Sequence, residues 1–140
     1  MDDESWKAGL TAWQLLESAV RDKVQPEDAG DLELAAEALA KGADINHRED
    51  GWSALLYAIV ENDARMVEWL IAHGARKEGR AVMEAARSDA SDALSVLLRH
   101  GYGPEWNEHG DSPLSLAARD GKHRVVPLLL AAGANVDHRD

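Results

Sequence analysis

The sequence predicts an all-α solenoid of about four helix-turn-helix repeats, joined by short hairpins that we call fingers. The composition favours helices over sheets. Among 140 residues there are 24 Ala and 17 Leu, whereas Val, Ile and Thr together number 13 and Phe is absent. Helices favour Ala and Leu, while strands favour β-branched and aromatic residues. The composition therefore argues against a large sheet.

Internal repeats supply the second and third observations. Residues Gly42–Arg48 read GADINHR, and residues Gly133–Arg139 read GANVDHR. Two more glycines, Gly74 and Gly101, each follow a histidine, so that the four glycines are spaced 32, 27 and 32 residues apart. A period near 30 residues is typical of stacked supersecondary units. We expect one domain over residues 1–140, with repeats at approximately 10–46, 47–75, 76–103 and 104–140.

Each repeat is predicted to hold two helices, although the first repeat matches only in its second helix. Ser53 and Ser112 are placed to cap a first helix, because a serine hydroxyl accepts a hydrogen bond from a backbone N–H of the first turn. A glycine ends each second helix, since glycine adopts the left-handed cap without steric cost. In chain order, the expected helices cover residues 32–41, 55–60, 65–72, 81–88, 90–99, 114–119 and 123–132.

The fourth repeat carries the clearest motif. Residues 112–118 read SPLSLAA, and they are followed by LLL at 128–130 and GANVD at 133–137. This text resembles the ankyrin repeat, which has a period of about 33 residues and the motif T-P-L-H-x-A. Residues 50–75 match nearly as well. The resemblance implies a protein-binding module whose finger tips and exposed first helices form a concave binding face.

The sequence departs from a regular repeat in three places. Repeat three is five residues short between Gly74 and its first helix, which predicts a blunted finger and a notch between the fingers of repeats two and four. Pro127 is expected as about the fifth residue of the last helix, where it would remove a hydrogen bond and bend the helix. That helix is also apolar on most sides, so some of residues 125–130 should face solvent. Either the chain continues in nature, or this face meets a partner or a second copy.

Composition and motifs also argue against several functions. The net charge is −11, which repels nucleic acid and anionic membranes. Cys is absent, the six His form no i,i+4 pair, and no phosphate-binding loop occurs, so we expect no metal, no cofactor and no enzyme. An acidic N-terminus and the absence of Cys are consistent with the cytoplasm.

The candidate binding residues follow from the resemblance and from the tryptophans. Trp52 follows Gly51 at a finger tip and Trp106 lies near the next finger, and Trp is enriched at binding hot spots. The alternatives are partial burial of these rings and an acidic face that serves solubility. Trp69, in contrast, is expected in the core. The expected partner-binding residues are Glu49, Asp50, Trp52, Glu61, Arg87, Trp106, Glu108, His109, Asp111, Arg119 and Asp120.

Acidic side chains outnumber basic ones on this surface, which predicts a protein partner with a basic surface. The leading hypothesis is an inhibitor or immunity-type protein that occludes a basic enzyme. The alternatives are a regulatory or scaffold ankyrin domain and a fragment of a larger multidomain protein. Self-association through the C-terminal helix is a further alternative.

Overall fold

The computed structural model describes residues 11–21, 30–103 and 112–133. These residues form eight helices and one two-stranded hairpin, which confirms the predicted all-α class. The elements are, in chain order, α1 (Ala12–Arg21), α2 (Gly30–Ala40), β1 (Arg48–Glu49), β2 (Trp52–Ser53), α3 (Ala54–Val60), α4 (Ala64–Ala72), α5 (Arg80–Arg87), α6 (Ser91–Arg99), α7 (Pro113–Arg119) and α8 (Val125–Ala131).

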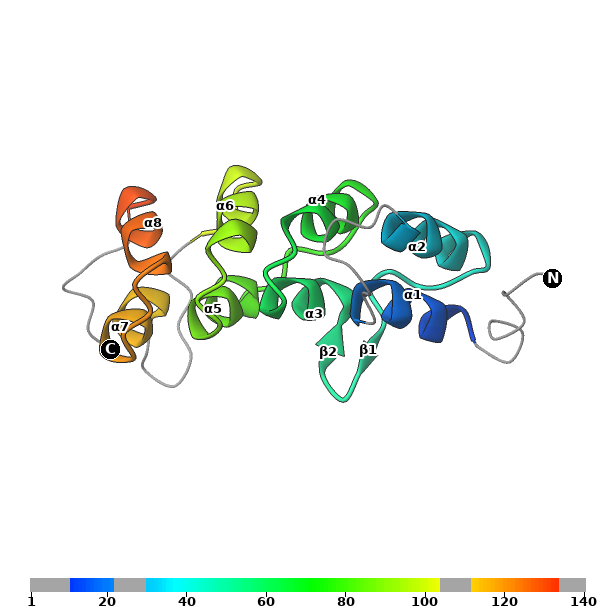
Figure 1. The fold of residues 1–140 in the computed structure, drawn as a ribbon, viewed down its shortest axis with the longest axis horizontal. Coiled ribbons are helices and arrows are strands. Elements are labelled where there is room, and N and C mark those ends of the chain that lie inside the picture. Colours follow the sequence, from blue (N-terminus) through cyan, green and yellow to red (C-terminus); the bar gives the residue numbers. More distant parts are fainter. Residues whose placement is uncertain (1–10, 22–29, 104–111, 134–140) are drawn as a thin grey trace.

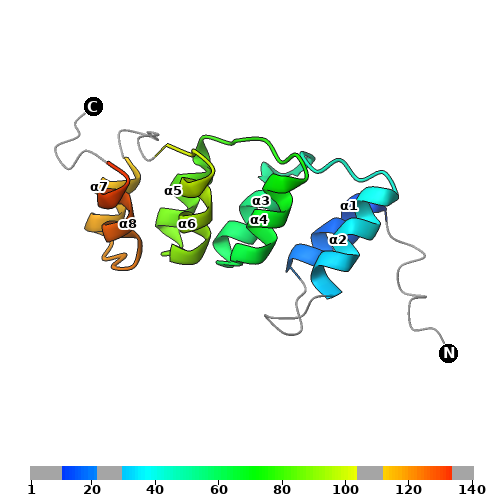
Figure 2. The ribbon, with the colours of Figure 1, turned by 90° about the horizontal axis from the view of Figure 1, so that it is seen from above.

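The helices form two rows. Helices α1, α3, α5 and α7 lie in one row and α2, α4, α6 and α8 in the other, with the hairpin projecting beyond the first row (Figure 1). Seen from above, the helix pairs follow one another along the long axis (Figure 2). Because each pair packs on the next, the core is continuous from Leu15 in α1 to Leu129 in α8.

Side-chain caps begin the first helices, as the sequence predicts. The Ser53 hydroxyl accepts a hydrogen bond from the N–H of Leu56 at 3.3 Å. Ser112 and Ser115 form a reciprocal capping box at the start of α7. A cap missed in the sequence begins α1. There Thr11 Oγ1 accepts from the N–H of Gln14 at 3.1 Å, while Gln14 Oε1 accepts from the N–H of Thr11 at 2.9 Å.

Successive helix pairs are also tied together by caps that cross from one pair to the next. Asn62, in the turn after α3, accepts from the N–H of Ala93 in α6 at 3.0 Å. Asp89, in the turn after α5, accepts from the N–H groups of Arg124 and Val125 at 3.0 and 3.2 Å. Both turn residues have positive φ, 57° and 51°, which Asn and Asp tolerate better than most side chains. One side chain thus ends a turn and fixes the stacking of the next pair.

One prediction about the helices is wrong. Helix α8 begins at Val125, so Pro127 is its third residue rather than its fifth. The first turn of a helix has no intrahelical acceptor for its N–H groups, so proline removes no hydrogen bond there. Trp69, expected in the core, is partly buried and packs against it, with its ring stacked on His73.

Part of the apolar last helix faces solvent, as predicted. Val125 and Leu129 are fully buried, whereas Leu130 is 45% exposed. In the described part of the chain, no helix combines the length and the hydropathy that a membrane crossing requires.

Candidate partner-binding surface

The hairpin brings three of the predicted site residues together. Its strands pair antiparallel, with Arg48 opposite Ser53 and Glu49 opposite Trp52. Asp50 and Gly51 form the two-residue turn, with φ of 53° and 83°. Positive φ at both central residues is the geometry for which an Asp-Gly pair is favoured. Glu49 and Asp50 are consequently exposed at the tip.

Trp52 is half-buried at the base of this hairpin. Its ring stacks on that of Tyr57 in α3, with centroids 5.3 Å apart and planes at 21°. The guanidinium of Arg80, the first residue of α5, lies 5.2 Å from the Trp52 ring centroid. Trp52 therefore contacts both Tyr57 and Arg80 within the chain and still presents part of its surface to solvent.

The short segment before α5 braces the hairpin. Residues 75–79 contain no strand, which confirms the blunted finger. Within it, Glu78 accepts hydrogen bonds from Arg48 and from the Ser53 hydroxyl, the latter at 2.6 Å. Arg80 Nη1 also donates to the carbonyl oxygen of Gly51 at 3.2 Å. The finger of one repeat is thus held by the next.

A charged stripe runs along α5 from the hairpin to the far end of the helix. Glu84, 5% exposed, accepts at the same oxygen, Oε2, from Arg80 Nη2 at 3.1 Å and from Arg87 Nη1 at 3.0 Å. Residues three and four apart share one face of a helix, so this spacing aligns the three side chains. Of the three, only Arg87 was among the predicted site residues.

The remaining described site residues lie away from the hairpin. Glu61 is the C-cap of α3, at the end of that helix opposite the hairpin, and it is exposed. Arg119 ends α7, and its Nε lies 3.4 Å from Oδ1 of Asp120. The predicted acidic surface therefore divides between the two ends of the first helices. Trp106, Glu108, His109 and Asp111 lie outside the described residues, as does the predicted finger of repeat four.

Three residues that complete the surface were not predicted, namely Tyr57, Arg80 and Glu84. The spacing of Arg80, Glu84 and Arg87 was the available signal, because i,i+4 and i,i+3 pairs of opposite charge meet on a helix. Tyr57 gave no such signal, since its stacking on Trp52 depends on the position of the hairpin relative to α3.

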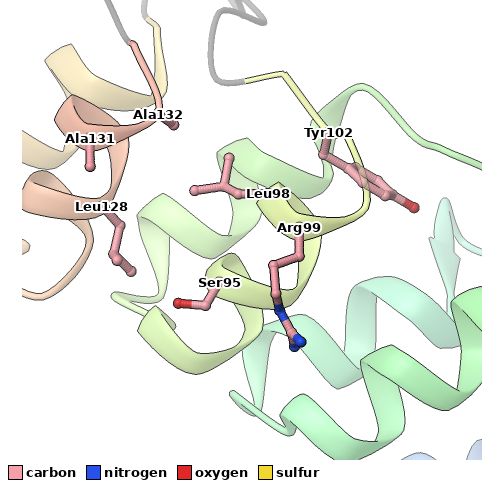
Figure 3. A pocket seen from close by; sticks show the side chains of 7 residues that line it. All are labelled: Ser95, Leu98, Arg99, Tyr102, Leu128, Ala131 and Ala132. Atoms are coloured by element: carbon pink, nitrogen blue, oxygen red, sulfur yellow. The ribbon is translucent and has the colours of Figure 1, made fainter.

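The second row of helices carries a different feature. A hollow of about 480 Å³ lies between α6 and α8, flanked by Leu98 on one helix and Leu128 on the other (Figure 3). The remaining lining residues are Ser95, Arg99, Tyr102, Ala131 and Ala132. Among the described residues, no group of three or more His, Asp or Glu side chains is arranged to hold a metal ion.

Stacked helix pairs, cross-pair caps and a projecting hairpin define a helical-repeat scaffold. The family described as ankyrin repeats (3 copies) matches residues 25–103 and 76–140. The chain therefore belongs to the ankyrin-repeat family, whose repeats generally mediate protein–protein interaction.

Similar proteins carry the same repeats. The chain is 31% identical over 113 residues to the ankyrin repeat domain-containing protein SAT10 of Stachybotrys chartarum, which covers 76% of this chain and 6% of that protein. It is 31% identical over 111 residues to the putative ankyrin repeat protein YahD of Escherichia coli, covering 76% and 44%. It is 36% identical over 63 residues to GA-binding protein subunit beta-1 of Homo sapiens, covering 44% and 15%. The chain thus spans less than half the length of each relative.

Proposed function

We propose that this chain binds a protein with a basic surface through the hairpin of residues 48–53 and the exposed side of α3 and α5. The observation that carries the proposal is the partly exposed Trp52 ring, which stacks on Tyr57 and contacts Arg80 beside the exposed carboxylates of the hairpin tip. A rigid aromatic ring loses little conformational entropy on binding, which makes it an effective anchor.

Charge supports the nature of the partner. The chain carries a net charge of −11, and Glu49 and Asp50 occupy the exposed tip of the hairpin. Complementary charge speeds the encounter of two proteins and orients it. We further propose an inhibitory or immunity-type role, in which the chain covers the active region of a basic enzyme.

A regulatory or scaffold role in a larger assembly is the second candidate. It is favoured by the relatives, because this chain matches only 6% to 44% of their length.

Self-association is an additional proposal for the last helix, and it is supported by the 45% exposure of Leu130. Light scattering coupled to size-exclusion chromatography tests it, and a monomer at high protein concentration contradicts it.

The charge proposal is tested on a partner recovered by affinity purification and identified by mass spectrometry. The double variant Glu49→Gln with Asp50→Asn removes the tip charges and retains residues compatible with the turn. The matched control, Glu33→Gln with Glu37→Gln, removes two charges from α2 in the second row.

Association kinetics are then measured from about 0.05 to 0.5 M salt, a range over which screening shortens the reach of charge severalfold. We expect the rate to fall by about tenfold for the parent and the control, and much less for the tip variant. A rate independent of salt contradicts a basic partner. If the partner is an enzyme, equimolar chain should abolish its activity; full activity in the complex favours the scaffold role instead.

A further inference from the structure

We infer that the second row of helices is a docking surface for an amphipathic helix of a protein partner. That helix carries two large apolar residues seven positions apart, and an acidic residue between them faces Arg99. The surface lies on the other row of the solenoid from the hairpin (Figure 1), so it is independent of the function proposed above.

Two largely apolar hollows lie on the second row, one on each side of α6. The first, of about 480 Å³, lies between α6 and α8, and the second, of about 430 Å³, lies between α4 and α6 and reaches Leu32 in α2. Trp69 lines the second hollow and is only partly buried, as are Leu98 and Leu128 in the first. Such side chains provide the apolar area that the core of an interface buries.

The spacing of the two hollows fits one helix. Packed helices lie about 8–10 Å apart, so hollows on the two sides of α6 lie about 10 Å from each other. A helix rises about 1.5 Å per residue, so residues i and i+7 lie on one face about 10 Å apart. A helix that crosses α6 therefore places one apolar residue in each hollow. It passes over Ser95, whose small side chain permits a close approach.

Arg99 lies between the hollows and lines both of them. Figure 3 shows its side chain extending away from α8, whereas Leu98 points toward Leu128. The Arg99 side chain is 67% exposed, and within the described part of the chain it donates only from Nη2, to Glu68 at 3.3 Å. A guanidinium has five N–H donors, so Arg99 retains donors for a carboxylate of the partner.

Glu68 keeps a partner when Arg99 turns toward a ligand. Its second carboxylate oxygen, Oε2, accepts a hydrogen bond from Nε2 of His100. Arg65, the third charged residue that lines the second hollow, has an interaction of its own within the chain and is not required for binding. The chemistry that fits this surface is therefore leucine-like side chains at i and i+7 with a glutamate at i+4.

Three peptides of about 18 residues test this inference on the full chain, a length at which an alanine-rich sequence forms a helix. All have blocked ends and the same alanine and glutamine background. The first carries leucine, glutamate and leucine at i, i+4 and i+7. The second replaces the glutamate with glutamine, and the third moves the second leucine two positions along, about 200° round the helix.

Binding is followed by NMR through the indole N–H signals of Trp69 and Trp52. We expect the first peptide to shift the signal of Trp69 and not that of Trp52. The glutamine peptide should bind about threefold more weakly, as expected for an exposed ion pair. The peptide with the displaced leucine should bind about tenfold more weakly, because one large apolar side chain is no longer buried.

Variants of the chain locate the contacts. Leu128→Ala should weaken the first peptide about fivefold. The matched control Leu39→Ala truncates a partly buried leucine of α2 that lines neither hollow, and it should change the affinity less than twofold.

Arg99→Gln should abolish the preference for the glutamate peptide over the glutamine peptide, because the preference arises from this pair alone. The control Arg76→Gln removes an exposed arginine of the segment before α5 and should keep the threefold preference. The amide spectrum of each variant shows whether it is folded.

Several outcomes overturn the inference. They are no shift at about 1 mM of the first peptide, equal affinity for the peptide with the displaced leucine, and a glutamate preference that survives Arg99→Gln. If the chain alone dimerises and Leu128→Ala abolishes the dimer, the hollow belongs to a second copy and the partner helix is excluded.

Discussion

The segment that leads into the second helix pair differs from the one that leads into the third. Ten residues separate Gly42 from Ser53 and build a hairpin, whereas five residues separate Gly74 from Arg80 and build none. The shorter segment instead places Glu78 and Arg80 against the neighbouring hairpin. The shortened finger thus stabilises the hairpin of the preceding repeat, so that the two segments act as one unit.

Removing the brace should have the largest effect on stability. Glu78→Ala loses the hydrogen bonds from Arg48 and Ser53, and hydrogen bonds to a charged group are worth about 1.5–3 kcal/mol each. We expect a loss of about 2 kcal/mol in the free energy of unfolding, measured by urea denaturation. The control Glu37→Ala breaks a partly exposed ion pair with Lys41 and should cost less than about 0.5 kcal/mol. Equal losses in the two variants would show that the segment does not brace the hairpin.

The caps formed by Asn62 and Asp89 should contribute similarly to stability, although the fingers of their repeats differ. Asn62→Gly and Asp89→Gly each keep the positive φ and remove the cap on the next second helix. Each should cost about 0.5 kcal/mol of unfolding free energy, less than the roughly 1 kcal/mol usual for a helix cap, because glycine relieves the strain of the positive φ. The two losses should be similar, because Asp89 accepts from the N–H groups of Arg124 and Val125 at the start of α8. Asn62 likewise makes two hydrogen bonds, since it accepts from the N–H of Ala93 and donates to Asp92 at 3.4 Å. If one of the two variants lost almost no unfolding free energy, the cap at that position would not stabilise the stacking of the helix pairs.

The last effect is absent at neutral pH and appears only above about pH 10. Tyr102, which follows α6, donates its hydroxyl to the carbonyl oxygen of Arg76 at 3.5 Å in the short segment. Burial, and then the charge of Glu78, raises its pKa from 10.0 to about 12. Above pH 10 the unfolded chain releases this proton while the folded chain retains it, so stability falls as pH rises from about 10 to 12. Tyr102→Phe should flatten this part of the stability profile, whereas identical slopes in the parent and the variant would contradict the burial of a neutral phenol.

Most of the fold could be predicted from the sequence because its signals are local. The serine caps, the glycine stops and the repeat period each depend on residues close together in the chain. Pro127 was misplaced because helix starts shift by a residue or two without changing the pattern. Thr11 and Gln14 match the sequence pattern of a capping box, but the start of α1 was not predicted from them.

The candidate site was predicted only in part, because its contacts cross between repeats. The hairpin tip follows from the local Asp-Gly turn, so Glu49, Asp50 and Trp52 were found together. Arg80 reaches Gly51 and Trp52 across about 29 residues of sequence, and no local pattern reports such a contact.

The most direct test of the central claim compares two partly buried tryptophans, one on the hairpin and one on a helix of the second row. Trp52 stacks on Tyr57 beside the hairpin, and Trp69 stacks on His73 in α4, with centroids 3.9 Å apart. Calorimetry with the purified partner measures the affinity of Trp52→Ala and Trp69→Ala, after circular dichroism has verified that both are folded. Trp52→Ala should weaken binding by about 2 kcal/mol, or roughly 30-fold, as expected for a hot spot, while Trp69→Ala should change it less than about threefold. Unchanged affinity in Trp52→Ala would contradict the assignment of this surface to partner binding.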